Sequence, residues 1–235
     1  MSTTLAALID VISDVIQDSS YTDAILKTRI NEAVENIAAG VRMPDGQVSP
    51  PLPDLYDMDT VVTSMTLPYK ALPTDYQRHV FMVADSNGNQ IHPPRGGDYY
   101  SFGLFLKQSS HKALTQGGSV YTACVKGLSL YYQGIPSASE TLTVHFYRVP
   151  TAMALDADNP EGIPSHLQTR LIKHFVCKEI FGDIEDGDNS VGTGMNYHTS
   201  RFYQAMVDLM DYIGIVDAVP EYYGTGMGGD LAVCD

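Results

Sequence analysis

The sequence predicts an α+β fold in which two helical hairpins, one at each end of the chain, enclose an antiparallel β domain. Apolar residues recur at helical spacing near both ends, strand-like alternation fills the middle, and a Pro-rich stretch separates the first hairpin from the strands. Because a two-helix hairpin cannot bury its apolar stripe alone, we expect the hairpins to pack as a four-helix bundle. The β domain is then an insertion, and an extended C-terminal arm follows.

Residues 1–40 are predicted to form the first hairpin. The stripe of its first helix comprises Leu5, Leu8, Ile9, Ile12, Val15 and Ile16, and that of its second comprises Leu26, Ile30, Ala33, Val34 and Ile37. A hydroxyl side chain at 2–4 is expected to cap the first helix. The second helix is expected from about Thr22 to Ala39, with Gly40 as its stop.

Residues 41–59 are predicted to be a stiff extended connector, because proline excludes helix and favours polyproline geometry. The β domain is expected at 60–150. Asn87-Gly88 predicts a two-residue hairpin turn, and the stretches at 120–125, 128–132 and 140–149 predict three strands of one meander. Their alternating apolar residues are Tyr121, Ala123 and Val125, then Leu128 and Leu130, then Leu142, Val144 and Phe146. The second half of 91–108 fits either a short helix or a strand.

Residues 151–214 are predicted to form the second hairpin, which packs on 1–40. Its first helix is expected to open at Ile163-Pro164, with proline in the first turn, and to end at Gly182. Its second helix is expected from about Tyr197 to Ile213, with Gly214 as its stop. Residues 215–235 lack periodicity and are predicted to be the extended arm.

The composition favours protein contacts over nucleic-acid binding. The 235 residues include 14 Lys and Arg against 28 Asp and Glu, a net charge of −14, and no basic cluster occurs. This argues against a phosphate-binding surface. Charged residues make up only 18% of the chain, against an average near 25%, and tyrosine occurs 15 times. Such a surface suits protein interfaces, although the tyrosines also suit a β core.

Cysteine usage and hydropathy indicate synthesis in the cytoplasm. Three cysteines without a C-x-x-C pair exclude a disulfide framework. The first sixteen residues lack a basic region, so no signal peptide is expected. No apolar run reaches the roughly 20 residues of a membrane helix, and no membrane partner is predicted.

Candidate motifs for chemistry fail on their context, so no catalytic, cofactor-binding or metal residue is predicted. Residues 224–229, GTGMGG, match G-x-G-x-x-G, but too little chain follows for the required helix. The related VGTGMN at 191–196 is interpreted as a loop. The acidic stretch 183–190 lacks the Gly and Glu of a calcium loop. His174 and Cys177 lack the second pair that structural zinc needs, so Cys177 is interpreted as a buried thiol. No G-x-S-x-G elbow is present, and the chain is predicted not to be an enzyme.

Several segments carry a resemblance to a known family. They are YTDAILKTRINEAVENIAAG and LPTDYQRHV in the first half, then YTACVKGLSLYYQGIPSASETLTVHFYRVPTAM, DNPEGIPSHLQTRLIKHFVCKEIFGD and YHTSRFYQAMVDLM. Together with the order of elements, they resemble the head-to-tail adaptor proteins, also called connector or head-completion proteins, of short-tailed bacteriophages. The long Gly-containing tail after Gly214 departs from the family pattern.

The resemblance implies a virion structural protein at the head–tail interface, made in the host cytoplasm. Its expected partners are further copies of itself in a ring of about twelve, the portal protein, and tail nozzle, tail tube or tail fibre proteins. DNA would pass through the lumen without sequence-specific binding, which an acidic wall favours. Two alternatives stay open: a tail-associated module whose β domain recognises a glycan or fibre, and a hydrolase with an acidic site, which would need paired carboxylates in a cleft.

The C-terminal arm is the predicted partner-binding site. Its apolar anchors, spaced by glycines, are Tyr222, Tyr223, Met227, Leu231 and Val233. A segment that is loose alone can become ordered on a partner. We expect this arm to dock on a neighbouring subunit or on the portal, and the alternative is a terminus without a role.

Overall fold

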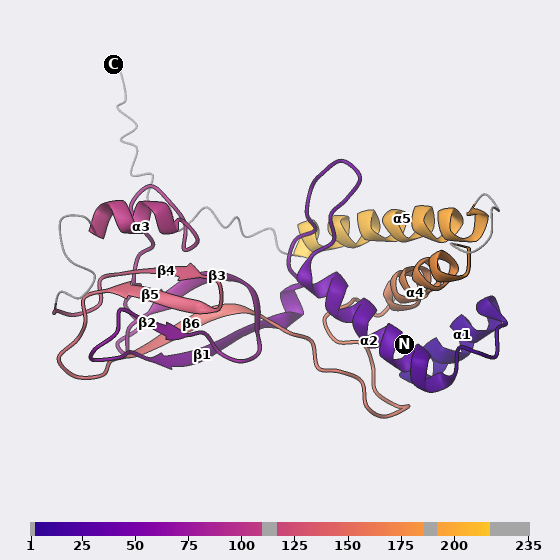
Figure 1. The fold of residues 1–235 in the computed structure, drawn as a ribbon, viewed down its shortest axis with the longest axis horizontal. Helices are drawn as coiled ribbons and strands as arrows, with labels where there is room; N and C mark the ends of the chain where they lie inside the picture. The colour runs from indigo at the N-terminus through magenta and orange to yellow at the C-terminus, as the bar shows by residue number, and fades with distance from the viewer. Residues whose placement is uncertain (1–2, 110–116, 186–191, 217–235) are drawn as a thin grey trace, which may run out of the picture. The chain divides into compact units, whose positions relative to one another are not determined.

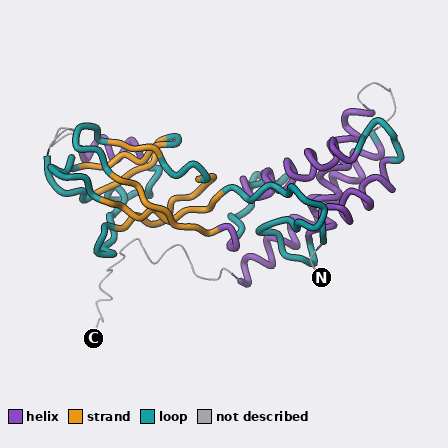
Figure 2. The backbone as a smooth tube through the Cα atoms, turned by 90° about the horizontal axis from the view of Figure 1, so that it is seen from below, coloured by secondary structure: helices purple, strands orange, loops and turns teal. Residues whose placement is uncertain are grey.

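The computed structural model describes residues 3–109, 117–185 and 192–216, and within them the fold is mixed α plus β, as predicted (Figures 1 and 2). The chain divides into two compact units. We call them the helical unit and the β unit. The helical unit comprises 1–57, 75–79 and 147–216, and the β unit comprises 58–74 and 80–146 within the described chain.

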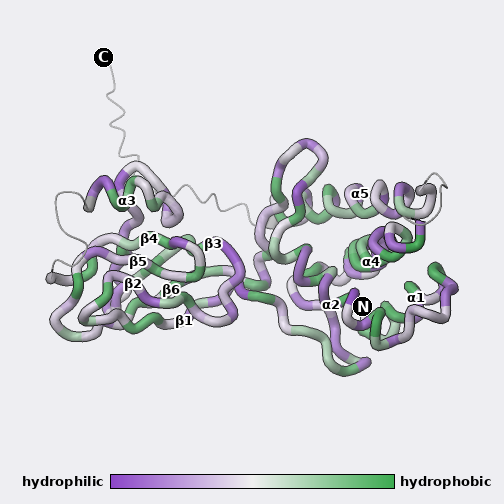
Figure 3. The backbone as a smooth tube through the Cα atoms, viewed as in Figure 1, coloured by the Kyte–Doolittle hydropathy of each residue, from purple (hydrophilic) through white to green (hydrophobic). Residues whose placement is uncertain are grey.

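In the part of the helical unit that the structure describes, four helices surround a shared apolar core. They are α1 (Leu5–Ile16), α2 (Asp23–Ala39), α4 (Gln168–Glu185) and α5 (Thr193–Val216). α4 and α5 lie side by side, and α4 also packs against α1 and α2. Figure 3 shows apolar residues recurring along these helices. Leu5, Leu8 and Ile12 are fully buried, which confirms the predicted stripe of α1. Thr4 caps this helix, because its Oγ1 accepts the N–H of Ala7 at 3.3 Å.

The ends of α4 and α5 differ from the prediction. Regular α4 begins at Gln168 rather than at Pro164, whose carbonyl accepts the N–H groups of Leu167 and Gln168 in a preceding turn. A glycine ends a helix by adopting left-handed backbone, and neither Gly182 nor Gly214 does so. Both helices therefore continue, α4 to Glu185 and α5 to Val216.

The start of α5 also corrects the interpretation of VGTGMN as a loop. Thr193 to Asn196 form the first turn of the helix. The Glu185 carboxylate accepts the N–H of Gly194 at 2.9 Å and that of Met195 at 3.2 Å. These donors have no partner inside a helix, and a carboxylate also suits the positive end of the helix dipole. An acidic side chain from α4 thus supplies the cap that the local sequence lacks.

The segment after α2 contributes to the helical core. Val41 and Met43 bond across a turn to Ser49 and Gln47, and a short 3-10 helix, η1 (Pro53–Leu55), follows. Met43, Leu52 and Leu55 are buried with the helices. The proline-rich chain therefore supplies apolar side chains as well as a path to the first strand.

Within the described ranges, two three-stranded antiparallel sheets form the β structure. One has the order β1-β6-β3, and the other has the order β2-β5-β4. Their bounds are β1 (Tyr56–Val62), β2 (Tyr69–Ala71), β3 (Tyr76–Ala84), β4 (Thr122–Lys126), β5 (Ser129–Gln133) and β6 (Thr141–Arg148). A helix, α3 (Phe102–Ser109), occupies the stretch whose type the sequence left open.

The predicted three-stranded meander is only partly correct. β4 and β5 form the expected hairpin, with Lys126 opposite Ser129. β6 does not continue it, because β6 lies between β1 and β3 in the other sheet. Its start is fixed there by Thr63, whose N–H donates to the Glu140 carbonyl at 2.9 Å and whose Oγ1 accepts the Glu140 N–H at 2.8 Å. Pairing with a segment far away in the chain overrides adjacency in sequence.

The turn after β3 is also longer than predicted. The N–H of Asp85 donates to the carbonyl of Asn89 at 2.9 Å, so three residues separate the closing pair. A two-residue type I′ turn needs positive φ at both central positions. Gly88 has φ +82°, whereas Asn87 does not have positive φ. The Asp85 carboxylate accepts from the N–H groups of Asn87 and Asn89, which stabilises the wider loop.

Candidate partner-binding surface

The predicted anchors of the C-terminal arm lie outside the described residues. This applies to Tyr222, Tyr223, Met227, Leu231 and Val233, and to the GTGMGG motif between them. Their role in docking stays a prediction. The described residues present a different candidate surface, on one face of the sheet β1-β6-β3.

Strand alternation defines this face. On β6, Leu142, Val144 and Phe146 are fully buried, so Thr143 and His145 point to the opposite side of the sheet. On β1, Val61 is buried, whereas Met58, Thr60 and Val62 are exposed and share the other side. The Phe81 ring on β3 lies 6.0 Å from the His145 ring, which places it on the same side. We call this surface the outward β face; its residues are Met58, Thr60, Val62, Phe81, Thr143 and His145.

The outward β face is apolar and uncharged at neutral pH. Met58 is 60% exposed, Val62 49% and Phe81 39%. None of its six residues is Asp, Glu, Lys or Arg. Partial burial lowers the pKa of His145, so its imidazole is neutral at pH 7. The alternation in YDMDTVV indicates a strand, but it does not show that the side with Met58 and Val62 is the exposed one.

Charge is distributed unequally between the units. The helical unit has 9 Lys and Arg against 20 Asp and Glu, a net charge of −11. The residues 58–74 and 80–146 have 5 against 4, a net charge of +1, and residues 217–235 account for the remaining −4. The sequence shows the total, but only the division into units shows that the acidic character belongs to the helices.

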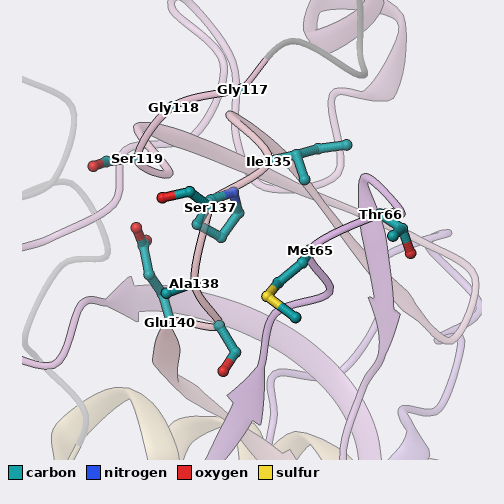
Figure 4. A pocket seen from close by; sticks show the side chains of 11 residues that line it. Met65, Thr66, Gly117, Gly118, Ser119, Ile135, Ser137, Ala138 and Glu140 are labelled. Atoms are coloured by element: carbon teal, nitrogen blue, oxygen red, sulfur yellow. The ribbon is translucent and has the colours of Figure 1, made fainter.

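A pocket of about 710 Å³ opens in the β unit (Figure 4). Its lining comprises Met65, Thr66, Gly117, Gly118, Ser119, Ile135, Pro136, Ser137, Ala138, Ser139 and Glu140. Glu140 is the one ionisable side chain among them. The serine and threonine hydroxyls and the Glu140 carboxylate can hydrogen-bond a polar ligand.

A histidine pair that the sequence did not reveal lies between α4 and α5. The Nδ1 atoms of His174 and His198 are 2.9 Å apart, and the side chains are 8% and 6% exposed. Burial, aided by the nearby positive charge of Lys173, lowers the pKa of His174 to about 4 and also lowers that of His198. One neutral ring donates and the other accepts. Since the pair spans 24 residues of sequence, no local pattern could have indicated it.

His174 therefore pairs with His198 and not with Cys177. Cys177 is fully buried, and burial raises the pKa of its thiol to about 11, so the thiol is protonated at neutral pH. Among the residues that the structure describes, no three His, Cys, Asp or Glu side chains are placed to hold a metal ion. None of the helices in the described ranges is long and apolar enough to cross a membrane.

These features define a protein suited to contacts with other proteins, with a packed helical core and an exposed apolar sheet face. The family comparison identifies the group. The family model described as SU10 adaptor protein matches residues 3–225, so the chain belongs to the SU10 adaptor protein family. The protein is a structural adaptor of a bacteriophage virion, and its family indicates a structural rather than a catalytic role. No curated protein matches the chain.

Proposed function

We propose that the protein forms a ring of about twelve copies at the head–tail interface of a short-tailed phage. In this role it binds the portal, extends the DNA channel and provides the attachment site for tail nozzle, tail tube or tail fibre proteins. The observation that supports this most directly is the contrast between an acidic helical unit and a neutral β unit with exposed apolar side chains. The acidic helical unit suits a channel wall, and the neutral β unit suits contacts with proteins.

The acidic helical unit supports passage of DNA without adhesion. The unit has 9 basic and 20 acidic side chains, so one-to-one ion pairs within the unit could neutralise at most nine carboxylates and would leave 11. From residue 1 to residue 26 the chain has four acidic side chains and no basic one. Such a surface repels phosphate over distances near the Debye length of about 8 Å. DNA that passes this wall is not bound in a sequence-specific way.

The C-terminal arm completes the proposal. We propose that its anchors, Tyr222, Tyr223, Met227, Leu231 and Val233, dock on a neighbouring subunit or on the portal. We also propose that the hairpins at 1–40 and 151–214 form a four-helix bundle, with the connector at 41–59 and the β domain at 60–150 between them and the arm at 215–235 after them. The shared core of α1, α2, α4 and α5 supports that arrangement.

Imaging tests this function. Purified protein, alone and mixed with portal, is examined by negative-stain electron microscopy. We expect rings, either free or seated on the portal. A protein that stays strictly monomeric and ignores the portal contradicts the proposal.

A second function, recognition of a glycan or a tail fibre by the β domain, is favoured by the pocket beside Glu140. Deletion of residues 215–235 separates the two functions. An adaptor whose arm docks should lose its binding to the portal, as measured by co-sedimentation. A glycan or fibre site in the β unit should keep its affinity.

A further inference from the structure

The outward β face has the composition of the centre of a protein interface. Such centres are enriched in aromatic residues and methionine and depleted of charged residues. Met58 and Val62 are exposed on β1 and Phe81 is exposed on β3, the two strands that flank the central strand β6. The threonines and His145 between them add polar atoms without adding charge at neutral pH.

The distribution of charge indicates which partner fits this face. Two copies of the chain, each with a net charge of −14, repel each other. The repulsion is strongest between helical units at −11 and absent for the β unit at +1. A basic partner would gain most from the acidic helices, whereas an equally acidic partner can approach best at the neutral, apolar face. Another copy of this chain is such a partner.

We infer that the outward β face contacts a second copy of this chain. This inference rests on the proposed ring and assigns one of its subunit contacts to named residues. In a ring, each subunit meets its neighbours through two different surfaces, so the face meets another part of the neighbour rather than its own copy. A test must therefore identify what the face touches without assuming that it touches itself.

Photo-crosslinking provides that test. Phe81 is replaced by p-benzoylphenylalanine in the full-length chain, and equal amounts of ¹⁵N-labelled and unlabelled protein are assembled with portal and irradiated. We expect crosslinked peptides that join a labelled to an unlabelled copy. Leu128, which is 73% exposed on the β4–β5 turn, receives the same substitution as a control. Crosslinks confined to the portal, confined to single molecules, or no more frequent than at Leu128 would overturn the inference.

A charge substitution tests the same face by its effect on assembly. Met58→Asp places a carboxylate in the contact, and we expect ring formation to weaken by more than about tenfold in sedimentation velocity. Leu128→Asp adds the same charge elsewhere and should assemble like the unchanged protein. Because Met58 is 60% exposed, we expect both variants to fold, which thermal melting by circular dichroism verifies.

The outcomes separate this inference from the proposed function. If the unchanged protein forms rings and Met58→Asp forms them equally well, the surface assignment is wrong and the ring stands. If the unchanged protein forms no ring with portal, both are wrong. Rings from the unchanged protein and from Leu128→Asp, with loss in Met58→Asp, support both.

Discussion

The helical unit and the β unit differ in their net charge and in the kind of side chain that they expose. The helices bury a continuous apolar core and expose an excess of carboxylates, with a net charge of −11. The sheets are near neutrality and leave methionine, valine and phenylalanine side chains exposed. Burial of these side chains is incomplete in the isolated chain. The comparison teaches that the two units bury apolar residues alike but differ in charge, so an apolar surface without charge is available on the β unit.

Ion pairs in the helical unit reinforce this contrast. Arg148 donates to Glu161 at 3.0 Å and lies 3.4 Å from Asp57, and the bond from Arg148 lowers the pKa of Glu161 to about 2. Arg170 pairs with Asp208 at 2.7 Å across α4 and α5. These bonds use two of the nine cations of the unit, whose net charge stays at −11.

We expect the largest effect on stability from a substitution in the helical core. Phe202 is 1% exposed on α5 and packs against Phe175, with ring centroids 5.3 Å apart. Phe202→Ala should lower the free energy of unfolding by about 3–5 kcal/mol, because it leaves a cavity. Val207→Ala on the same helix is the matched control; Val207 is 47% exposed, and a change within about 0.5 kcal/mol is expected. Urea unfolding followed at 222 nm measures both, and equal losses would contradict a core concentrated at this position.

The helical core was predictable because its signal is local. Leu5, Leu8 and Ile12 lie within two turns, and their spacing alone indicates a buried stripe. The membership of β6 in a different sheet was not predictable, because Thr63 and Glu140 meet across 77 residues. The same limit applies to the cap that Glu185 gives Gly194. Contacts between residues far apart in the chain decide such features, and the periodicity of the sequence does not reveal these contacts.

The candidate binding sites also differ in how far the sequence can predict them. The sequence predicts the arm as a site, because its glycines and aromatic residues lie next to one another in the chain. The outward β face depends on three strands, and Phe81 joins it only because β3 lies beside β6. The exposed side of a strand cannot be known until its buried side is, and that requires the partner sheet.

The next largest effect concerns pH. His174 and His198 are buried as neutral rings, and the charged groups around them, Lys173, Arg170 and Arg201, are all cationic. The folded pKa of His174 is about 4, below the ordinary value of 6.5, so the folded state binds protons less readily than the unfolded chain. Stability is therefore unaffected above pH 6.5 and falls as the pH drops toward 4, by about 3 kcal/mol.

A double variant checks this assignment. In His174→Asn/His198→Asn the amides can still pair but do not titrate. We expect the fall in unfolding free energy between pH 6.5 and 4 to shrink by most of its size. Denaturant midpoints measured at half-unit pH steps give the profile. An unchanged slope would show that other groups cause the acid sensitivity of the helical unit.

The smallest expected effect is a difference in stability between two variants of the β unit, in which alanine replaces glycines with nearly equal φ angles. Gly134 has φ +86° and Gly88 has φ +82°, so alanine at either position is strained by a similar amount. A Cβ at Gly134 would lie 2.2 Å from the Ser119 carbonyl oxygen, whereas nothing lies within 4 Å of a Cβ at Gly88. Gly134→Ala should therefore destabilise the protein by about 2 kcal/mol more than Gly88→Ala, because backbone must move.

Gly134 stands where the chain leaves β5 for the segment that leads to β6, so this pair of variants tests how firmly that crossing is held. Chemical denaturation followed by tyrosine fluorescence measures the difference. Equal effects would mean that the close approach of Ser119 relaxes at little cost, and that the pairing of β6 with β1 and β3 suffices to separate it from the β4–β5 hairpin. A larger loss of stability in Gly134→Ala would show that the path of the chain from β5 toward β6 depends on a residue without a side chain at this position.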